Sequence, residues 1–371
     1  MRVALLALYS SALTIASPKG VFPLSEQAAA AAGERLVRPE FHGSAAEYFR
    51  VWIVNLLFTL LTLGIYSAWA KVRKLRYLYG NTRLDGDTFN YFASARAILK
   101  GRLLAVGVFF AYAILTELYP VSFWAFLAAG VLLLPLILVR ALRFNARMSA
   151  WRGLRFDFPA RVRDALPLYL GMSLLVVATL GLAYPWLIAK HKQFVLSHHA
   201  FGTTPLGCTV PVGSVYGIHL RAGLIIAGMS LVAVLGAAVV SPVAVLLPQA
   251  GWLAFLLPVL AIYIAYAFAY AYLQARLTNL VWQNTYGAGV RFSSTLGAID
   301  LAGLYISNLL AIVFTLGLAV PWAVVRTLRY RMENFAMLVT EEVVHEASPE
   351  LRNVSATGQE LGEIFNVNFG V

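Results

Sequence analysis

The chain has little of what a soluble protein or a redox enzyme needs. Of its 371 residues only 12% are charged, whereas a soluble domain has roughly 25%. Its one cysteine, Cys208, excludes an internal disulfide and any cysteine-based metal or iron–sulfur site. Acids are scarce as well, 17 against 29 Lys and Arg. The sequence therefore does not fit a soluble globular domain.

Apolar sequence is abundant instead. Apolar residues make up 60% of the chain, and the mean hydropathy is +0.74. About 20 residues, at 1.5 Å each, cross the ~30 Å hydrocarbon core of a bilayer. The runs that reach this length are 51–70, 165–189 and 301–325, with parts of 103–139 and 222–273. The sequence predicts an all-α fold, a polytopic transmembrane helix bundle with about seven apolar segments.

The charges divide the chain into a basic body and an acidic end. Residues 341–371 have six Glu and one Arg, a net charge of −5, so the rest of the chain carries +17 of the total of +12. Lys and Arg beside apolar runs are typical of cytoplasmic loops that face anionic lipid headgroups. We therefore expect an anionic lipid bilayer as partner, no nucleic acid, and a disordered acidic cytoplasmic tail over 341–371. The sequence indicates no oligomeric state.

Residues 1–37 form an N-terminal lead. A charged start, the apolar stretch 3–15 and the small residues after it resemble a secretory signal peptide. A mis-assigned start codon and a short interfacial helix are the alternatives. We expect residues 19–40 to be mobile.

One motif organises the remainder, because it occurs three times. The copies are Thr62–Trp69, Thr179–Trp186 and Thr315–Trp322, and each ends an apolar run and precedes basic residues. Neighbouring residues match at offsets of 117 and 136. We therefore predict internal repeats of a three-segment unit, an apolar helix followed by an apolar hairpin. Within a transmembrane domain of 38–340, the units cover about 38–152, 155–288 and, as a partial copy, 291–340.

The first helix of each unit either crosses the membrane once or bends at Gly64, Gly181 and Gly317 and returns. With single crossings, Lys190 and Arg276 fall outside the cell. With bends, nearly every Lys and Arg lies on one side, but irregular backbone at membrane depth must be surrounded by protein or a water-filled cavity. We favour single crossings, because 20–25 residues suit one span better than two.

Several residues of the unit are candidates for a functional role. Gly and Pro loosen the backbone, Pro suits the first turn of a restarted helix, and Trp anchors at the headgroup level. We favour a structural hinge and anchor over a gated path for Gly64, Trp69, Gly181, Pro185, Trp186, Gly317, Pro321 and Trp322. The cations that follow each Trp by four residues, on the same helical face, are expected to meet lipid phosphate: Arg73, Lys190 and Arg326.

Polar residues near or within the apolar helices have two readings each. Glu47, Asp164 and Asp300 precede their Trp by 22 residues, where an acid complements the helix dipole; a proton or cation site is the alternative. Asn55 and Asn308 lie two turns before their Thr and are expected to bond across helices rather than to a solute.

No catalytic or cofactor motif is present. There is no P-loop, nucleophile elbow, His-Glu-x-x-His or dinucleotide fingerprint. His191, His198 and His199 have no nearby Cys or carboxylate to complete a metal site. We expect a protein that is not an enzyme, with no cofactor and no metal. A small β-hairpin is expected around Asp85-Gly86, because Asp-Gly supplies positive φ.

The chain resembles the YjgN-like family of bacterial inner-membrane proteins of unknown function. The resemblance extends from about residue 38 to the C-terminus and rests on the segments Phe41-His42-Gly43, Glu47-Tyr48-Phe49, Asn55, Thr62–Ala70, Arg76–Thr82 and Gly358–Phe365. It implies a multi-pass protein of the bacterial inner membrane and brings no activity.

Two functions are open at this point. Repeats of odd helix number are a device of secondary transporters, which bind substrate near broken helices, so a small-solute transporter or channel is the first. A non-transporting envelope protein that binds anionic lipid or partner proteins is the second. A water-accessible cavity lined by Asn55 and Asn308 would favour transport, and a solid apolar interior would argue against it.

Overall fold

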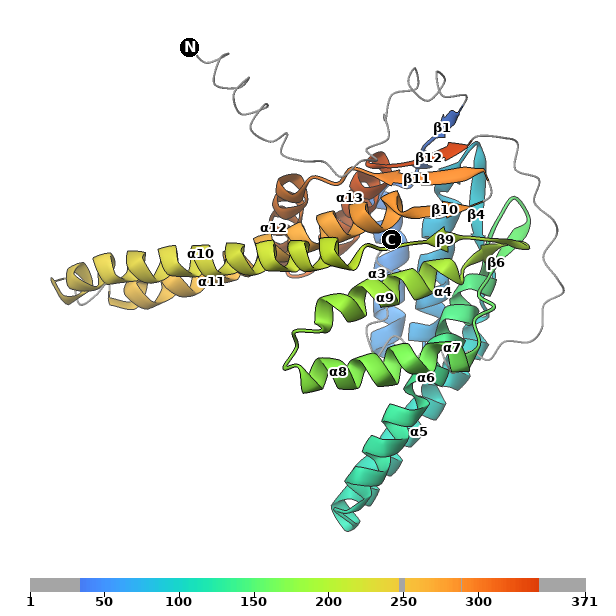
Figure 1. The fold of residues 1–371 in the computed structure, drawn as a ribbon, viewed down its shortest axis with the longest axis horizontal. Coiled ribbons are helices and arrows are strands. Elements are labelled where there is room, and N and C mark those ends of the chain that lie inside the picture. The colour runs from blue at the N-terminus through green and yellow to red at the C-terminus, as the bar shows by residue number, and fades with distance from the viewer. Residues whose placement is uncertain (1–33, 247–250, 288, 340–371) are drawn as a thin grey trace.

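The computed structural model describes residues 34–246, 251–287 and 289–339. The expected signal-like lead before residue 34 and the acidic tail after residue 339 lie outside these residues. Short helical hairpins, long helical hairpins and small strands make up the described part (Figure 1). The short hairpins are α3 (Ala45–Leu61) with α4 (Ser67–Gly80), α7 (Val162–Leu166), η1 (Pro167–Met172) and α8 (Ser173–Ala178) with α9 (Tyr184–Ser197), and α12 (Ala298–Phe314) with α13 (Val320–Glu333).

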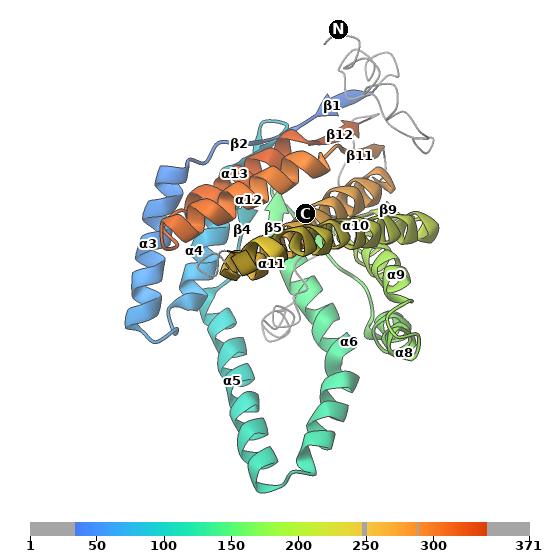
Figure 2. The same ribbon diagram turned by 90° about the vertical axis from the view of Figure 1, so that its left-hand side faces the viewer.

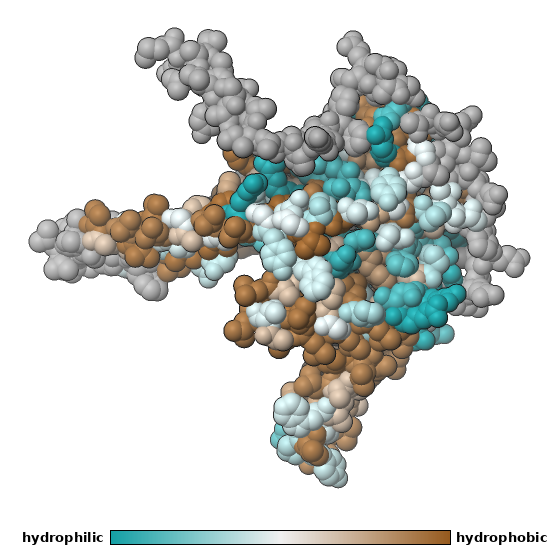
Figure 3. Space-filling model, in the orientation of Figure 1, coloured by the Kyte–Doolittle hydropathy of each residue, from teal (hydrophilic) through white to brown (hydrophobic). Residues whose placement is uncertain are grey.

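The long hairpins pair α5 (Ala95–Leu118) with α6 (Ser122–Met148) and α10 (Val212–Leu246) with α11 (Gly251–Gln283). Among the described residues these four helices are long and apolar enough to cross a membrane. Both hairpins project from the body, and brown apolar surface covers them while teal polar surface gathers on the body (Figure 3). They leave the body in different directions, so at most one of them lies along the normal of a flat bilayer (Figure 1).

The expectation of one continuous helix in each Thr-to-Trp segment is wrong. The chain leaves α3 at Leu61, turns within five residues and returns as α4 beside it (Figure 2). The other two segments break in the same way between α8 and α9 and between α12 and α13. The seven expected apolar segments are therefore four long helices and three hairpins in the described chain.

The expectation of an all-α fold is also wrong, because strands join every pair of helical hairpins. They form a five-stranded sheet, β1-β12-β11-β10-β9, and a seven-stranded sheet, β2-β3-β4-β5-β6-β7-β8. The strands are β1 (Arg35–Val37), β2 (Pro39–Phe41), β3 (Thr82–Leu84), β4 (Asp87–Tyr91), β5 (Ser149–Trp151), β6 (Leu154–Asp157), β7 (Ala200–Phe201), β8 (Thr204–Pro205), β9 (Gly207–Cys208), β10 (Thr285–Gly287), β11 (Val290–Ser294) and β12 (Phe335–Val339).

The two sheets connect into a closed circuit of pairings. Only Arg38 separates β1 from β2, and only Leu206 separates β8 from β9. Every printed pairing is antiparallel, as short hairpins require. Residues 35–41, expected to be mobile, are thus held between β12 and β3. The circuit gathers the ends of the helical hairpins at one base.

The predicted hairpin at Asp85-Gly86 is confirmed. Asp85 and Gly86 have φ of 52° and 83°, the pattern of a two-residue turn between β3 and β4. Asp85 also accepts a two-oxygen ion pair from Arg35 at 2.7 and 2.8 Å and a third bond from Arg152 at 2.9 Å. Arg35, with Arg152 second, lowers the pKa of Asp85 through these contacts. The strand circuit is therefore tied by charge as well as by its ladder.

The first and third short hairpins pack against each other, although they are the farthest apart in sequence. Phe41 and Tyr48 of the first form a buried cluster with Val325 of the third. Arg329 Nη2 donates to the Gly43 carbonyl at 3.3 Å. The second hairpin packs instead on the base of α6 and on α10 and α11.

Candidate functional site

The three hairpin turns have the same backbone conformation. In each turn a Leu with φ of 49–50° precedes a Gly with φ of 90–92°. Gly64 N–H donates to the Thr59 carbonyl at 2.7 Å and Leu63 N–H to the Leu60 carbonyl at 3.1 Å, the two bonds of a Schellman motif. Two successive left-handed residues end the first helix and reverse the chain. This is why a segment long enough to span does not continue as one helix.

The threonine of the motif joins the two helices of each hairpin. Thr62 Oγ1 donates to the Phe58 carbonyl at 2.7 Å and accepts from the Tyr66 N–H at 2.9 Å. Thr179 and Thr315 make the same two bonds. One hydroxyl thus closes the end of the first helix and caps the start of the second. The sequence marked this role only by the recurrence of Thr before Leu-Gly.

The turns end in apolar tips that touch no other part of the described chain. Leu63, Leu180 and Leu316 are each 95% exposed, the highest value among the exposed large apolar residues. A Cβ added to Gly64, Gly181 or Gly317 would meet no atom within 4 Å. A protruding apolar tip of this kind marks a surface made for an apolar surrounding.

Behind the tips, the predicted tryptophans and cations follow at the start of each second helix. Pro185 and Pro321 lie in the first turn of α9 and α13, as predicted. The Arg326 guanidinium lies 5.0 Å from the Trp322 ring centroid, within cation–π range. Arg326 Nη1 also donates inward to Ser307 Oγ at 2.6 Å and to Asn308 Oδ1 at 3.2 Å, whereas Arg73 is exposed.

Asn55 and Asn308 bond across the helices of their own hairpins, as predicted. Asn55 Nδ2 donates to the Ala70 carbonyl and Asn308 Nδ2 to the Ala323 carbonyl, both at 3.4 Å. Asn308 also donates to Thr327 Oγ1 at 3.0 Å. The two asparagines therefore hold hairpins together and line no cavity that we find between them.

The acids act at helix starts, the first of their two predicted readings. Glu47 lies in the first turn of α3, where its N–H donates to Ser44 Oγ at 3.2 Å. Asp164 Oδ2 accepts the Arg161 N–H at 3.0 Å, half of a capping box, and Asp300 lies in the first turn of α12. All three complement the helix dipole.

A tyrosine closes the base of the first and third hairpins, and sequence reasoning missed it. Tyr77 Oη accepts the Ser44 N–H at 3.1 Å and donates toward the Ser44 carbonyl at 3.0 Å. Tyr330 Oη does the same with Gly297 N–H at 3.1 Å. Burial, together with Glu47, raises the pKa of Tyr77, so its hydroxyl keeps the proton that it donates. The second hairpin has Phe194 at the matching position.

We expect Tyr77→Phe and Tyr330→Phe each to lower the free energy of unfolding by about 1–2 kcal/mol, since each removes a hydrogen bond and leaves a backbone N–H unpaired. Thermal unfolding of the protein in a neutral detergent measures this loss. Tyr263→Phe, at a side chain that is 70% exposed, is the control and should leave stability unchanged. Equal stability of all three variants would contradict the role of the base tyrosines.

The histidines serve the fold. Tyr169 Oη lies 3.0 Å from His191 Nδ1, and burial with the nearby Lys192 charge lowers the pKa of His191 to about 4. His198 and His199 each place Nδ1 within 2.8 Å of a backbone carbonyl one turn earlier. In the described chain no group of three or more His, Cys, Asp or Glu could hold a metal ion.

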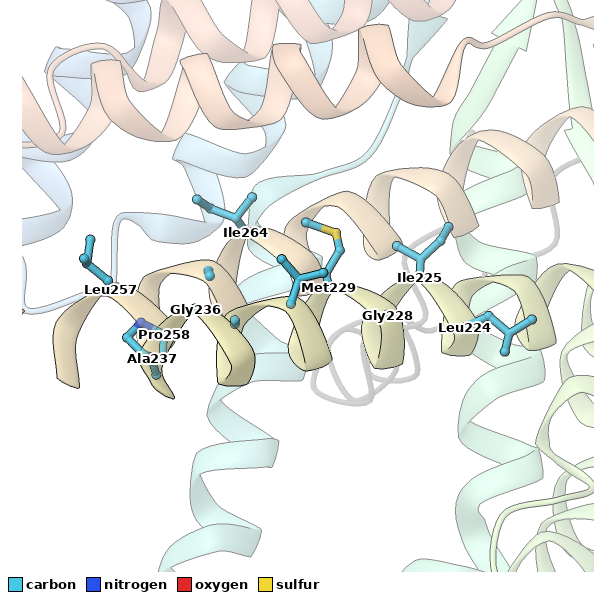
Figure 4. A pocket seen from close by; sticks show the side chains of 12 residues that line it. Leu224, Ile225, Gly228, Met229, Gly236, Ala237, Leu257, Pro258 and Ile264 are labelled. Carbon is cyan, nitrogen blue, oxygen red and sulfur yellow. The ribbon is translucent and has the colours of Figure 1, made fainter. Parts of the chain in front are cut away.

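A groove of about 640 Å³ lies between α10 and α11. Gly228 and Gly236 open it on one helix, and Leu257, Pro258 and Ile264 border it on the other (Figure 4). All of its lining side chains are apolar. It is therefore suited to hydrocarbon and differs from the polar cavity that transport through the short hairpins would need.

These features can be set beside known proteins. The family model described as "Bacterial protein of unknown function (DUF898)" matches residues 37–364. The chain belongs to this DUF898 family. DUF898 thus covers both the short hairpins and the strand circuit, and it confirms the resemblance found in the sequence.

Named relatives of this DUF898 protein are called inner membrane protein YjgN. The chain is 31% identical to that of Escherichia coli O157:H7 over 147 residues, 39% of this chain and 36% of the relative. It is 36% identical to that of Escherichia coli K12 over 124 residues, 32% and 30% of the two chains. The alignments thus span about a third of the relatives' length. No solved structure matches the chain.

Proposed function

We propose that this DUF898 protein is a multi-pass protein of the bacterial inner membrane that binds anionic phospholipid and does not transport. The observation that carries the proposal is the set of three hairpins with identical turns, each with a fully exposed leucine tip and cations behind it. Such hairpins dip into a leaflet with their tips and meet headgroups with their cations.

The distance from tip to cation sets the depth of the dip. Lys71 follows Gly64 by seven residues, and Lys190 and Arg326 follow their glycines by nine. At 1.5 Å per helical residue these separations are about 10–14 Å, less than half of the ~30 Å hydrocarbon core. The hairpins therefore enter one leaflet without crossing the other.

The positions of the cations support one orientation. Arg102 at the start of α5, Arg140 near the end of α6, Arg221 in α10 and Arg276 in α11 all lie toward the base where the strand circuit gathers the hairpins. The positive-inside rule assigns this base to the cytoplasm. Strand β12, which leads to the C-terminus, then lies on the cytoplasmic side.

We also infer that the three hairpins are copies of one unit, two complete and one partial. Matching Thr, Leu and Gly make matching hydrogen bonds in all three turns. In the first and third hairpins the Asn-to-carbonyl bond joins residues 15 apart, and the Tyr-to-backbone bond joins residues 33 apart. Shared internal contacts at shared spacings support duplication better than sequence offsets alone.

A small-solute transporter is the second candidate. Breaks in apolar helices favour it, since transporters bind substrate at such breaks. Against it, the asparagines expected to line a path bond within their hairpins, and the groove that we describe is apolar. Comparing the metabolites of a deletion strain with those of its parent separates the two: a solute that accumulates or disappears on deletion would favour transport.

The double variant Arg73→Gln/Lys190→Gln should bind anionic lipid about 30-fold more weakly, because each cation near a headgroup contributes about 1 kcal/mol. The measurement is the amount of phosphatidylglycerol that co-purifies, and its exchange with phosphatidylcholine in nanodiscs. Arg35→Gln/Arg152→Gln is the control, as these arginines are already neutralised by Asp85 and Asp87. Equal lipid retention by both double variants would count against the proposal.

A further inference from the structure

Two cations from different hairpins face each other inside the body. Lys192 lies on α9 and Arg331 on the last turn of α13 (Figure 1). Burial lowers the pKa of Lys192, and the Arg331 charge lowers it further, so the two groups are close enough to repel. The segments that carry them are about 140 residues apart in sequence. The fold therefore brings two like charges together in a dehydrated place.

Neither charge is balanced within the described chain. Arg331 Nη2 donates to Tyr305 Oη at 3.1 Å, a neutral acceptor. Arg331 Nε is buried and has no hydrogen-bond partner among the described residues. No described carboxylate forms an ion pair with Lys192 or Arg331. Buried unpaired charge is costly, so an anion from outside these residues would relieve both repulsion and desolvation.

The hairpin fold does not need these cations. Lys192 corresponds to Leu75 in the first hairpin and to Leu328 in the third. Arg331 corresponds to Leu78 and Val195. At both positions the other two copies pack an apolar side chain in the same helical setting. A charge that replaces leucine in one copy, and that meets a second such charge, has a role that packing does not supply.

We propose that Lys192 and Arg331 form a binding site for a phosphate group. Two positive charges match the charge of a phosphate, and the guanidinium offers an unused N–H in the fork geometry that phosphate oxygens accept. The phosphate belongs to a free anionic solute or to a lipid headgroup. The site does not depend on the leaflet binding proposed above, because Arg73 and Lys190 take no part in it.

The test uses the full chain, purified and delipidated in a neutral detergent. Inorganic phosphate should raise the melting temperature of the protein above the value in chloride of equal ionic strength. Lys192→Leu and Arg331→Leu, which insert residues found in the other copies, should bind phosphate at least tenfold more weakly. Lys74→Leu, at an exposed lysine of α4, removes the same charge and should bind like the unmodified protein.

A second arm distinguishes the two sources of phosphate. Stabilisation by phosphatidylglycerol with none by inorganic phosphate assigns the site to a headgroup, and the reverse assigns it to a solute. Without either probe, the two leucine variants should be at least as stable as the unmodified protein, because they remove unpaired buried charge. If both probes act equally on all variants, or if the leucine variants lose stability equally with and without them, the proposal is overturned.

Discussion

Cysteines introduced at Pro205 and Tyr286 should react with a membrane-impermeant maleimide only from the cytoplasmic side, and cysteines at Tyr119 and Trp252 only from the periplasmic side. Pro205 and Tyr286 lie in strands of the base, and Tyr119 and Trp252 near the far ends of the long hairpins; all four are exposed. Three hairpins that return leave every base strand on one side.

The competing topology gives the opposite result at three of the four positions. If each short hairpin were one crossing helix, Pro205 and Tyr286 would label from outside and Trp252 from inside, while Tyr119 would still label from outside. Tyr119 is therefore the internal control for sidedness. Cys208 is 4% exposed, and a Cys208→Ser background removes its residual reaction. Labelling of Pro205→Cys in intact cells would refute the returning hairpins.

The long hairpins were predictable from sequence because hydrophobic length alone defines them. A run of about 20 apolar residues has few alternatives to crossing a membrane. The short hairpins were equally apolar, and length favoured the wrong answer for them. What decides their course is the φ of two residues, and Leu63 is an unexpected one, since a branched side chain rarely takes a left-handed conformation.

The strand circuit was beyond sequence reasoning for a different reason. Its strands are two to five residues long, too short for a period of two to be distinguished from chance. Only the Asp85-Gly86 turn carried a local signal strong enough to use. Of the candidate site residues, the helix-start acids and the bonding asparagines followed from local rules. The pairing of Lys192 with Arg331 did not, because it depends on which hairpins become neighbours.

The variant Gly64→Ala/Gly181→Ala/Gly317→Ala should lose about 3–6 kcal/mol of unfolding free energy, and each single variant about 1–2 kcal/mol. A Cβ at these positions would meet nothing within 4 Å, so the loss comes from forcing alanine to φ of 90–92°. The turns lie in separate hairpins with no shared contact at their tips, so the losses should add. The sum is comparable with the whole stability of a domain.

Gly107→Ala and Gly130→Ala are matched controls with the opposite expected sign. Both glycines lie inside the long helices α5 and α6, have no positive φ and leave equal space for a Cβ. Alanine there should stabilise by about 0.4–1 kcal/mol, because it restricts the unfolded chain without strain. Melting temperatures in one detergent separate the two sets. If the turn variants melted like the helix variants, left-handed backbone would not define the hairpins, and the three tips could not return as described.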